Sequence, residues 1–170
     1  KAAFSPAPEG RVWTVLPNAV PDPFETGPPD LPSGTRFHLL MVGRINAWKG
    51  QDLLLEAIAC LPPELRDRIA LRMIGSGFEE DQRMAELKKT ARNVLGDHAE
   101  LRDFEADPFD SFAWANAVVV PSRRPEPFGL VAIEAMAAGR AVIAADHGGL
   151  SEIVEDRVTG RRFAPNNTAA

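Results

Sequence analysis

The segment "AVVVPSRRPEPFGLVAIEAMAAGRAVIAAD", residues 117–146, holds the pattern that decides the fold. It starts with a run of valines, passes through a proline-rich loop into an alanine-rich helical stretch, and resumes as a second apolar run after Gly139. Glycine is frequent just beyond a helix C-terminus, and continuous apolar runs are typical of strands that are buried on both faces. The segment therefore predicts a strand, a crossover helix and a second, parallel strand.

The same alternation continues on both sides of this unit. Further strands are expected at residues 37–43 ("FHLLMVG"), 69–75 ("IALRMIG"), 99–104 ("AELRDF") and 160–165 ("GRRFAP"). Helices are expected at residues 49–61, about 79–95, 108–117 and 149–156. The first of these helices places Leu54, Ile58 and Leu61 on one face. We predict a doubly wound, Rossmann-like α/β fold, whose parallel sheet is covered by helices on both faces.

Composition bounds the classes of function. The 170 residues are 45% hydrophobic, which is enough for one compact domain with a core. The net charge of −5 argues against a general binder of nucleic acids or anionic membranes. No apolar run reaches the roughly 18 residues of a membrane span, and no signal peptide is visible. A cytoplasmic protein is therefore expected, with peripheral membrane association of the full-length protein as the alternative.

Metal and disulfide chemistry find little support in the sequence. Cys60 is the single cysteine and cannot form an internal disulfide, and its place in "LLLEAIACLP" predicts a buried, small apolar residue. The three histidines are scattered and no Asp-x-Asp pair exists. We therefore predict no metal site.

The strand pattern also indicates where a ligand would bind. Sheets of this class bind ligands beyond the carboxyl ends of their strands, which makes the loops after the strands the candidate region. These loops are residues 43–50, 75–79, 103–108, 121–129 and 145–149.

In the first loop, "VGRINAWKG", Arg44 ends a strand and Lys49 opens the next helix. Helix N-termini and basic side chains both attract phosphate, so this pair indicates an anion site, with a solvated surface loop as the alternative. The order Lys49-Gly50-Gln51 differs from a Walker P-loop, which needs Gly-Lys-Ser/Thr. In "MIGSGFEED", Gly75 and Gly77 form part of a dinucleotide fingerprint without its third glycine, and a tight turn explains both. A Rossmann oxidoreductase is therefore disfavoured.

Two glutamates stand out in the segment quoted first. Glu126 lies in the proline-rich loop, and Gly129 and Leu130 offer backbone N–H groups at the start of the helix that follows. Glu134 lies within the apolar helix, where an unpaired buried carboxylate is costly. It either marks the solvent side of the helix or accepts hydrogen bonds from paired ligand hydroxyls. With phosphate at Arg44 and Lys49, hydroxyls at the two glutamates would describe a nucleotide-sugar site.

These motifs, taken together, carry a family resemblance. "EPFGLVAIE", residues 126–134, is a Glu-x7-Glu motif that resembles the donor-binding motif of retaining glycosyltransferases of the GT-B fold, in family 4. The segments "VGRINAWKG", "AVVVPS" and "GGLSEIV" are similar to other segments of that family, in the same order, and "VLPNAVPDPF" is similar to its interdomain segment. The similarity spans about residues 12–165.

The resemblance implies a role for each candidate residue. Arg44 and Lys49 would clamp the donor diphosphate and stabilise the charge on the leaving nucleoside diphosphate, and Glu126 would contact the transferred sugar. Glu134 would hold the ribose hydroxyls. Backbone N–H groups would contact phosphate or sugar oxygens at Phe128, Gly129 and Leu130. The base would lie near Asp103, Phe104 and Glu105, although the family usually has glycine at position 103.

The resemblance also implies an activity and a domain organisation. An NDP-sugar would donate its sugar, without a metal ion, to an unknown acceptor, for which a carbohydrate or a lipid-linked molecule is compatible. Residues 1–35, with eight of the fifteen prolines, would contain the end of a preceding domain, one short strand and an interdomain linker. Residues 36–170 would form the donor-binding domain, truncated at its C-terminal end. Without the N-terminal GT-B domain this fragment is expected to be inactive.

Two other functions remain open at this point. A GT-B nucleotide-sugar epimerase keeps the fold without transfer to an acceptor, and a non-catalytic nucleotide-binding or interaction module keeps the scaffold alone. Four further residues lie close to the candidate site without an assigned chemical role, and a structural or solvated position is the plain interpretation for each: Trp48, Arg123, Arg124 and His147.

Overall fold

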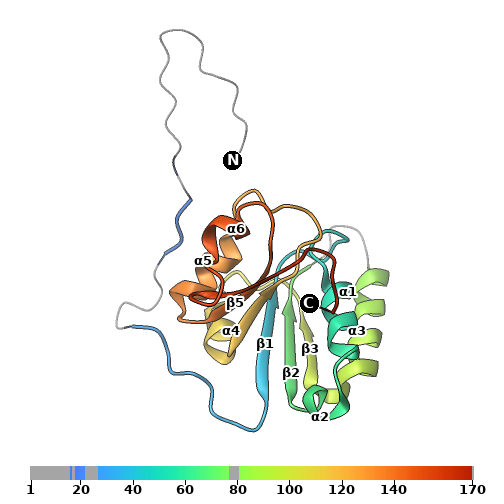
Figure 1. The fold of residues 1–170 in the computed structure, drawn as a ribbon. Helices are drawn as coiled ribbons and strands as arrows, with labels where there is room; N and C mark the ends of the chain where they lie inside the picture. The colour runs from blue at the N-terminus through green and yellow to red at the C-terminus, as the bar shows by residue number, and fades with distance from the viewer. Residues whose placement is uncertain (1–15, 17, 22–26, 77–80, 170) are drawn as a thin grey trace, which may run out of the picture.

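The computed structural model describes residues 16, 18–21, 27–76 and 81–169. Within these residues, six parallel strands form one sheet in the order β3-β2-β1-β4-β5-β6 (Figure 1). The strands are β1 Phe37–Val42, β2 Ile69–Ile74, β3 Ala99–Arg102, β4 Ala117–Val120, β5 Ala141–Ala145 and β6 Gly160–Phe163. The doubly wound α/β prediction is confirmed, and each strand expected after residue 36 is present.

The helices alternate with the strands. They are α1 Gln51–Ala59, α2 Pro63–Arg66, α3 Asp81–Leu95, α4 Phe109–Trp114, α5 Leu130–Ala137 and α6 Leu150–Ile153, with a short 3-10 helix at Gly96–His98. The sequence pattern did not predict α2 or the 3-10 helix, because each is a single turn and too short for a helical period. The short strand expected in the first 35 residues falls largely on residues 12–15, outside the described part of the chain.

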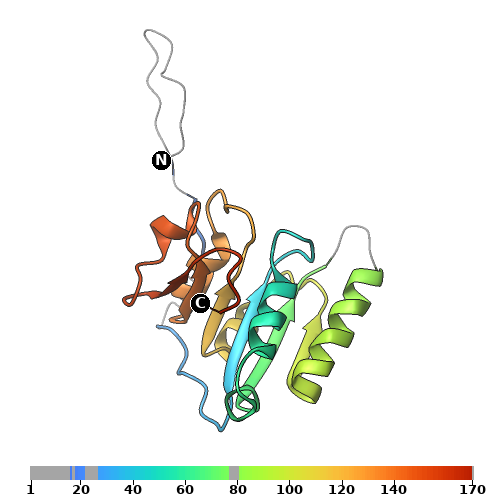
Figure 2. The same ribbon diagram turned by 45° about the vertical axis from the view of Figure 1, so that its right-hand side comes forward.

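Two hydrophobic cores lie on the two faces of the sheet, beneath the two layers of helices that Figure 2 shows. On one face, α1 and α3 cover alternate side chains of the strands, such as Leu39 and Met41 of β1. On the other face, α4, α5 and α6 cover the intervening side chains, such as Leu40. Val118 and Val119 of β4 are both buried, one in each core. A strand buried on both faces needs a continuous apolar run, which explains why "AVVV" predicted the fold.

The sheet order places a topological switch point between β1 and β4. The chain winds outward from β1 through β2 to β3, and then returns to build β4, β5 and β6 on the opposite side. The loops after β1 and β4 therefore diverge from neighbouring strands at the same edge of the sheet. In sheets of this kind the crevice at that point is the usual ligand site.

Two glycines allow close approaches between the loops that follow β1, β2 and β4. Gly50 precedes α1 with φ 78°, and a Cβ there would overlap the carbonyl oxygen of Pro121 in the loop after β4. A Cβ on Gly75 would overlap the carbonyl oxygen of Gly43. Backbone packing thus explains Gly75 without a dinucleotide, as the sequence analysis expected, while Gly77 lies outside the described residues.

The interpretation of Cys60 as a buried residue is wrong. Cys60 directly follows α1 and is exposed. Leu54 and Ile58 form the buried stripe of α1. At about 100° per residue, the side chain two positions after Ile58 points away from that stripe.

Part of the proline-rich segment packs against the domain. Arg140 is 3% exposed and donates hydrogen bonds to the backbone carbonyls of Phe112 and Asp30, each at 3.0 Å. A Cβ on Gly139 would lie 2.6 Å from the Cβ of Pro28. The segment around residues 28–32, part of the predicted interdomain linker, is therefore anchored beside the C-terminal end of α5.

Within the described residues, no helix has both the length and the apolar character needed to cross a membrane.

Candidate functional site

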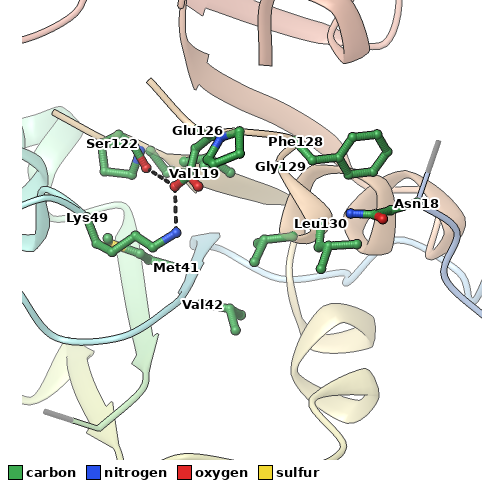
Figure 3. A pocket seen from close by; sticks show the side chains of 14 residues that line it. Asn18, Met41, Val42, Lys49, Val119, Ser122, Glu126, Phe128, Gly129 and Leu130 are labelled. Atoms are coloured by element: carbon green, nitrogen blue, oxygen red, sulfur yellow. Dashed lines mark hydrogen bonds and ion pairs between the residues drawn. The ribbon is translucent and has the colours of Figure 1, made fainter. Parts of the chain in front are cut away.

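A cavity of about 340 Å³ opens at the switch point (Figure 3). Its walls come from the ends of β1 and β4, the loop after β4 and the first turn of α5. The lining residues predicted from the sequence are Lys49, Glu126, Phe128, Gly129 and Leu130. The lining residues that the sequence analysis did not assign include Asn18, Ser122 and Val131. Five of the seven predicted site residues thus line one cavity, which lies at the carboxyl edge of the sheet where the sequence pattern predicted the ligand region.

Lys49 and Glu126 form an ion pair inside this cavity. The Lys49 Nζ lies 2.5 Å from the Glu126 Oε1, and the two side chains are only 24% and 15% exposed (Figure 3). Lys49 follows β1 and Glu126 follows β4, so the pair joins loops that are 77 positions apart in the sequence. A basic and an acidic group are thus held together in a largely desolvated place, where each interaction is stronger than on the open surface.

Ser122 shares the same carboxylate oxygen. Its side chain is 2% exposed, and its Oγ donates a hydrogen bond of 2.5 Å to the Glu126 Oε1. Sequence reasoning missed this residue. The sequence could have indicated Ser122, because it directly follows "VVVP" and a small polar residue at the end of a buried strand needs a hydrogen-bond partner.

The loop that carries Glu126 is braced by the segment after β5. The His147 Nε2 lies 2.8 Å from the Ser122 carbonyl oxygen, and the Gly149 N–H donates a 2.8 Å hydrogen bond to the Glu126 carbonyl. Glu126 and Gly148 also pair as an isolated parallel bridge. A Cβ on Gly148 or Gly149 would overlap or crowd this loop. The "HGG" sequence is therefore explained by close backbone contact with the candidate site.

Three further side chains tie the loops after β1 and β4 together. The Arg123 guanidinium forms a 2.9 Å ion pair with Asp52 on α1. The backbone N–H of Arg123 donates a 2.6 Å hydrogen bond to the Trp48 carbonyl. Burial opposes the charged form of Asp52, but the Arg123 hydrogen bond and charge outweigh it and lower the Asp52 pKa. Arg124 stacks on the Trp48 ring, with its Cζ 4.3 Å from the ring centroid. These contacts give Trp48 and both arginines structural roles.

The start of α5 forms another wall of the cavity. Gly129 precedes this helix with φ 104°, a conformation that favours glycine, and no side chain caps the helix. Gly129, Leu130 and Val131 line the cavity, so the first turn of α5 borders it. The first N–H groups of a helix carry a partial positive charge and bind anions.

Two of the predicted residues do not line the cavity. Arg44 is exposed, and its guanidinium has no ion pair with any residue that the structure describes. Glu134 is half-buried in α5, and its carboxylate has no hydrogen bond within the described ranges. Burial raises the pKa of Glu134. The two alternatives for Glu134 therefore stay open, because the carboxylate is neither paired with a described residue nor fully solvated.

The three residues expected near a base lie beyond β3, apart from the cavity. Phe104 is 71% exposed. Glu105 forms a 3.2 Å ion pair with Arg102 and accepts a hydrogen bond from Ser111. None of Asp103, Phe104 and Glu105 lines the cavity, and a role in base binding stays a prediction.

The fold and the cavity define a class of domain. A 3-2-1-4-5-6 parallel sheet with a cavity at its switch point, bordered by a helix N-terminus, is a Rossmann-like nucleotide-binding arrangement. The family model described as "Glycosyl transferases group 1" matches residues 26–170. The chain therefore belongs to the group 1 glycosyltransferases.

Similar proteins support this assignment. A D-inositol 3-phosphate glycosyltransferase of Streptomyces coelicolor is 37% identical over an alignment 183 positions long, which covers 98% of this chain and 38% of the relative. A lipopolysaccharide 1,2-N-acetylglucosaminetransferase of Salmonella typhimurium is 37% identical over 132 residues, covering 74% of this chain and 34% of that protein. The chain thus spans little more than a third of the length of these relatives.

Solved structures show the same fold. HepE of Anabaena, solved in complex with UDP-glucose, superimposes with a TM-score of 0.70 at 32% identity, over 78% of this chain and 36% of that one. Sucrose-phosphate synthase of Thermosynechococcus elongatus gives a TM-score of 0.67 at 34% identity, over 78% and 33%. The Rossmann-like α/β domain is thus that of GT-B glycosyltransferases.

Proposed function

We propose that this domain binds the nucleoside diphosphate sugar donor of a retaining glycosyltransferase, and that the full-length enzyme transfers the sugar to an acceptor. The observation that carries the proposal is the placement of Lys49 and Glu126, side by side, in the switch-point cavity beside the start of α5. One cation, one carboxylate and a helix N-terminus match a ligand that has both phosphates and hydroxyls.

The first step is the binding of the diphosphate. Lys49 supplies a positive charge that is mostly withdrawn from solvent, and the first turn of α5 supplies backbone N–H groups. Arg44 lies in the same loop as Lys49, and its guanidinium, unpaired among the described residues, is available to a second phosphate. These charges would also stabilise the nucleoside diphosphate as it leaves, where negative charge develops.

The second step is the binding of the hydroxyl groups. Glu126 lines the cavity and would contact the transferred sugar. Glu134 lies four residues after Leu130, a lining residue, and positions i and i+4 share one face of a helix. A ribose that extends from the cavity along α5 would therefore meet a carboxylate that has no partner among the described residues.

We propose a uridine nucleotide as the first ligand to test, because the structurally similar HepE was solved with UDP-glucose. We also propose that binding needs no metal ion, since Lys49, Arg44 and the α5 N-terminus provide the positive charge. Adding EDTA should leave the affinity for UDP unchanged, and a loss of binding would contradict this part of the proposal.

The acceptor is proposed to bind outside this domain. The chain covers 38% of the D-inositol 3-phosphate glycosyltransferase and 36% of HepE. A second domain, packed over the switch-point edge, would close the cleft and present a carbohydrate or lipid-linked acceptor. The epimerase alternative is not favoured, because the relatives carry the names of transferases.

Calorimetric titration with UDP, GDP and ADP tests the proposal, using this chain and the full-length protein. The matched control is the double variant Glu126→Ala/Glu134→Ala. We expect one nucleotide to bind and the double variant to bind it at least about tenfold more weakly, because the Glu134 carboxylate no longer accepts hydrogen bonds from the ribose hydroxyls. If the full-length protein binds none of the three, a non-catalytic scaffold replaces the donor site as the better interpretation.

A further inference from the structure

We propose that Ser122 is a positioning residue for Glu126, and that His147 fixes Ser122 in turn. In this arrangement the Oε1 of Glu126 is held by the protein, and its Oε2 is left for the ligand. The inference rests on the proposed donor site and adds to it the residue that orients the sugar-contacting carboxylate.

The contacts of the Glu126 carboxylate are one-sided. Its Oε1 accepts hydrogen bonds from the Lys49 Nζ and the Ser122 Oγ, each at 2.5 Å (Figure 3). Its Oε2 has no hydrogen bond within the described part of the chain, although Glu126 lines the cavity. Two donors on one oxygen restrict rotation of the carboxylate, so the second oxygen keeps a defined direction.

Ser122 is suited to this role because its side chain is buried and its backbone is held by a hydrogen bond. The side chain is 2% exposed, so its hydroxyl must find a partner inside the protein. The backbone at Ser122 is held from the other side by His147, whose Nε2 lies 2.8 Å from the Ser122 carbonyl. A carbonyl oxygen can only accept, so the Nε2 of His147 carries the proton in this contact.

Fixing the Glu126 carboxylate in advance favours ligand binding. Glutamate has several rotatable bonds, and ordering a long side chain only when the ligand arrives costs conformational entropy. A carboxylate that is already oriented avoids this cost, which favours the bound state. Ser122 therefore acts on the ligand only through Glu126, and this sets a specific requirement for the test.

The experiment measures calorimetric affinities of the full-length protein for UDP-glucose and for UDP. Ser122→Ala should weaken UDP-glucose binding up to about tenfold, because the ligand must then order the freed Glu126 side chain, and should change UDP binding less than about twofold. Ser122→Thr keeps the hydroxyl and should restore most of the affinity. In a Glu126→Ala background, Ser122→Ala should have no further effect.

Ser111→Ala is the matched control. Ser111 is also fully buried and also donates its hydroxyl to a carboxylate, that of Glu105, but it lies outside the cavity. Removal of the Ser111 hydroxyl should leave the ratio of the affinities for UDP-glucose and UDP unchanged.

The outcomes separate the two proposals. If the unaltered protein binds both ligands and Ser122→Ala keeps the ratio of the affinities, the positioning role is wrong and the donor site stands. An equal loss for UDP and UDP-glucose, or a loss that persists in the Glu126→Ala background, shows a merely structural role for Ser122. If the unaltered protein binds neither ligand, the uridine donor site is wrong and the positioning role falls with it.

Discussion

The loop that carries Glu126 and the helix that carries Glu134 hold their carboxylates in opposite ways. The loop is fixed from three directions, by Lys49, by Ser122 and by the glycine pair after β5. In α5, by contrast, the Glu134 carboxylate is half-buried and has no partner among the described residues. One carboxylate is therefore already oriented by its neighbours, whereas the other is left for the ligand to satisfy under the proposed function.

The paired and the unpaired carboxylate differ in the free-energy cost of carrying a charge. A paired carboxylate retains its charge because its partners replace water, whereas an unpaired carboxylate that loses part of its hydration disfavours the charged form. Local strain of this kind gathers at functional sites, where the surrounding structure sustains it. The proposed donor site thus combines one preformed contact with one unsatisfied group.

The largest effect is expected when the support of the loop is removed. In Gly149→Ala the new Cβ would overlap the Phe128 carbonyl oxygen and lie 2.7 Å from the Phe128 Cα. Backbone atoms cannot move aside as a flexible side chain does, so we expect a loss of about 2–3 kcal/mol in the free energy of unfolding, as for an overpacked core. Urea denaturation measures it.

Gly34→Ala is the control for this prediction, because a Cβ there meets nothing within 4 Å. It should leave the free energy of unfolding within about 0.5 kcal/mol of that of the parent protein. If Gly149→Ala proves as stable as Gly34→Ala, the glycine pair does not fix the Glu126 loop.

An intermediate effect is expected when Lys49 is removed. Lys49→Ala deletes the cation of the cavity and leaves Glu126 with the Ser122 hydroxyl alone. UDP binding should fall about tenfold or more, since a charge-assisted contact to phosphate is lost. Uridine binding should fall much less. Calorimetric titration of both ligands measures the difference.

Lys88→Ala is the matched control, because Lys88 is an exposed lysine on α3, outside the cavity. It should bind UDP as the parent does. An equal loss of UDP and uridine binding in Lys49→Ala would place Lys49 away from the phosphates.

Most of the fold could be predicted from sequence because its signal is local. The apolar runs of β1, β2, β4 and β5, broken only by His38 and Arg72, and the intervening helices specify a parallel sheet that is buried on both faces. Once the class of sheet was known, topology alone indicated the carboxyl edge as the candidate ligand region. That is why Lys49, Glu126 and the start of α5 could be named before any coordinates.

The bracing of the site could not be predicted, because its contacts are set by tertiary structure. The His147 ring reaches Ser122 across 25 positions, and the Lys49–Glu126 pair spans 77. Which face of a loop a side chain occupies is not encoded by any period of the sequence. The exposure of Glu134 could not be predicted either. Helical periodicity did not decide whether its side chain faces solvent or is buried, and the structure shows it partly buried.

The smallest effect on stability, with an opposite effect on binding, is expected for Glu134→Gln. Burial raises the Glu134 pKa above its ordinary value of 4.5. The folded state therefore binds more protons than the unfolded state between 4.5 and the raised pKa, so this group makes the protein less stable as pH increases through that window. Glutamine removes the penalty. At pH 7 the variant should be more stable, by less than about 1 kcal/mol because solvent screens a half-exposed group.

The same substitution should weaken nucleotide binding, since a neutral amide accepts hydrogen bonds from ribose hydroxyls less strongly than a carboxylate does. Thermal unfolding at pH 4 and pH 7, with and without UDP, measures both effects. The stability gain should be present at pH 7 and absent at pH 4, where Glu134 is mostly protonated in both states. A variant that binds UDP as well as the parent would show that Glu134 merely tolerates its partial burial, and the contrast with Glu126 would then have no functional meaning.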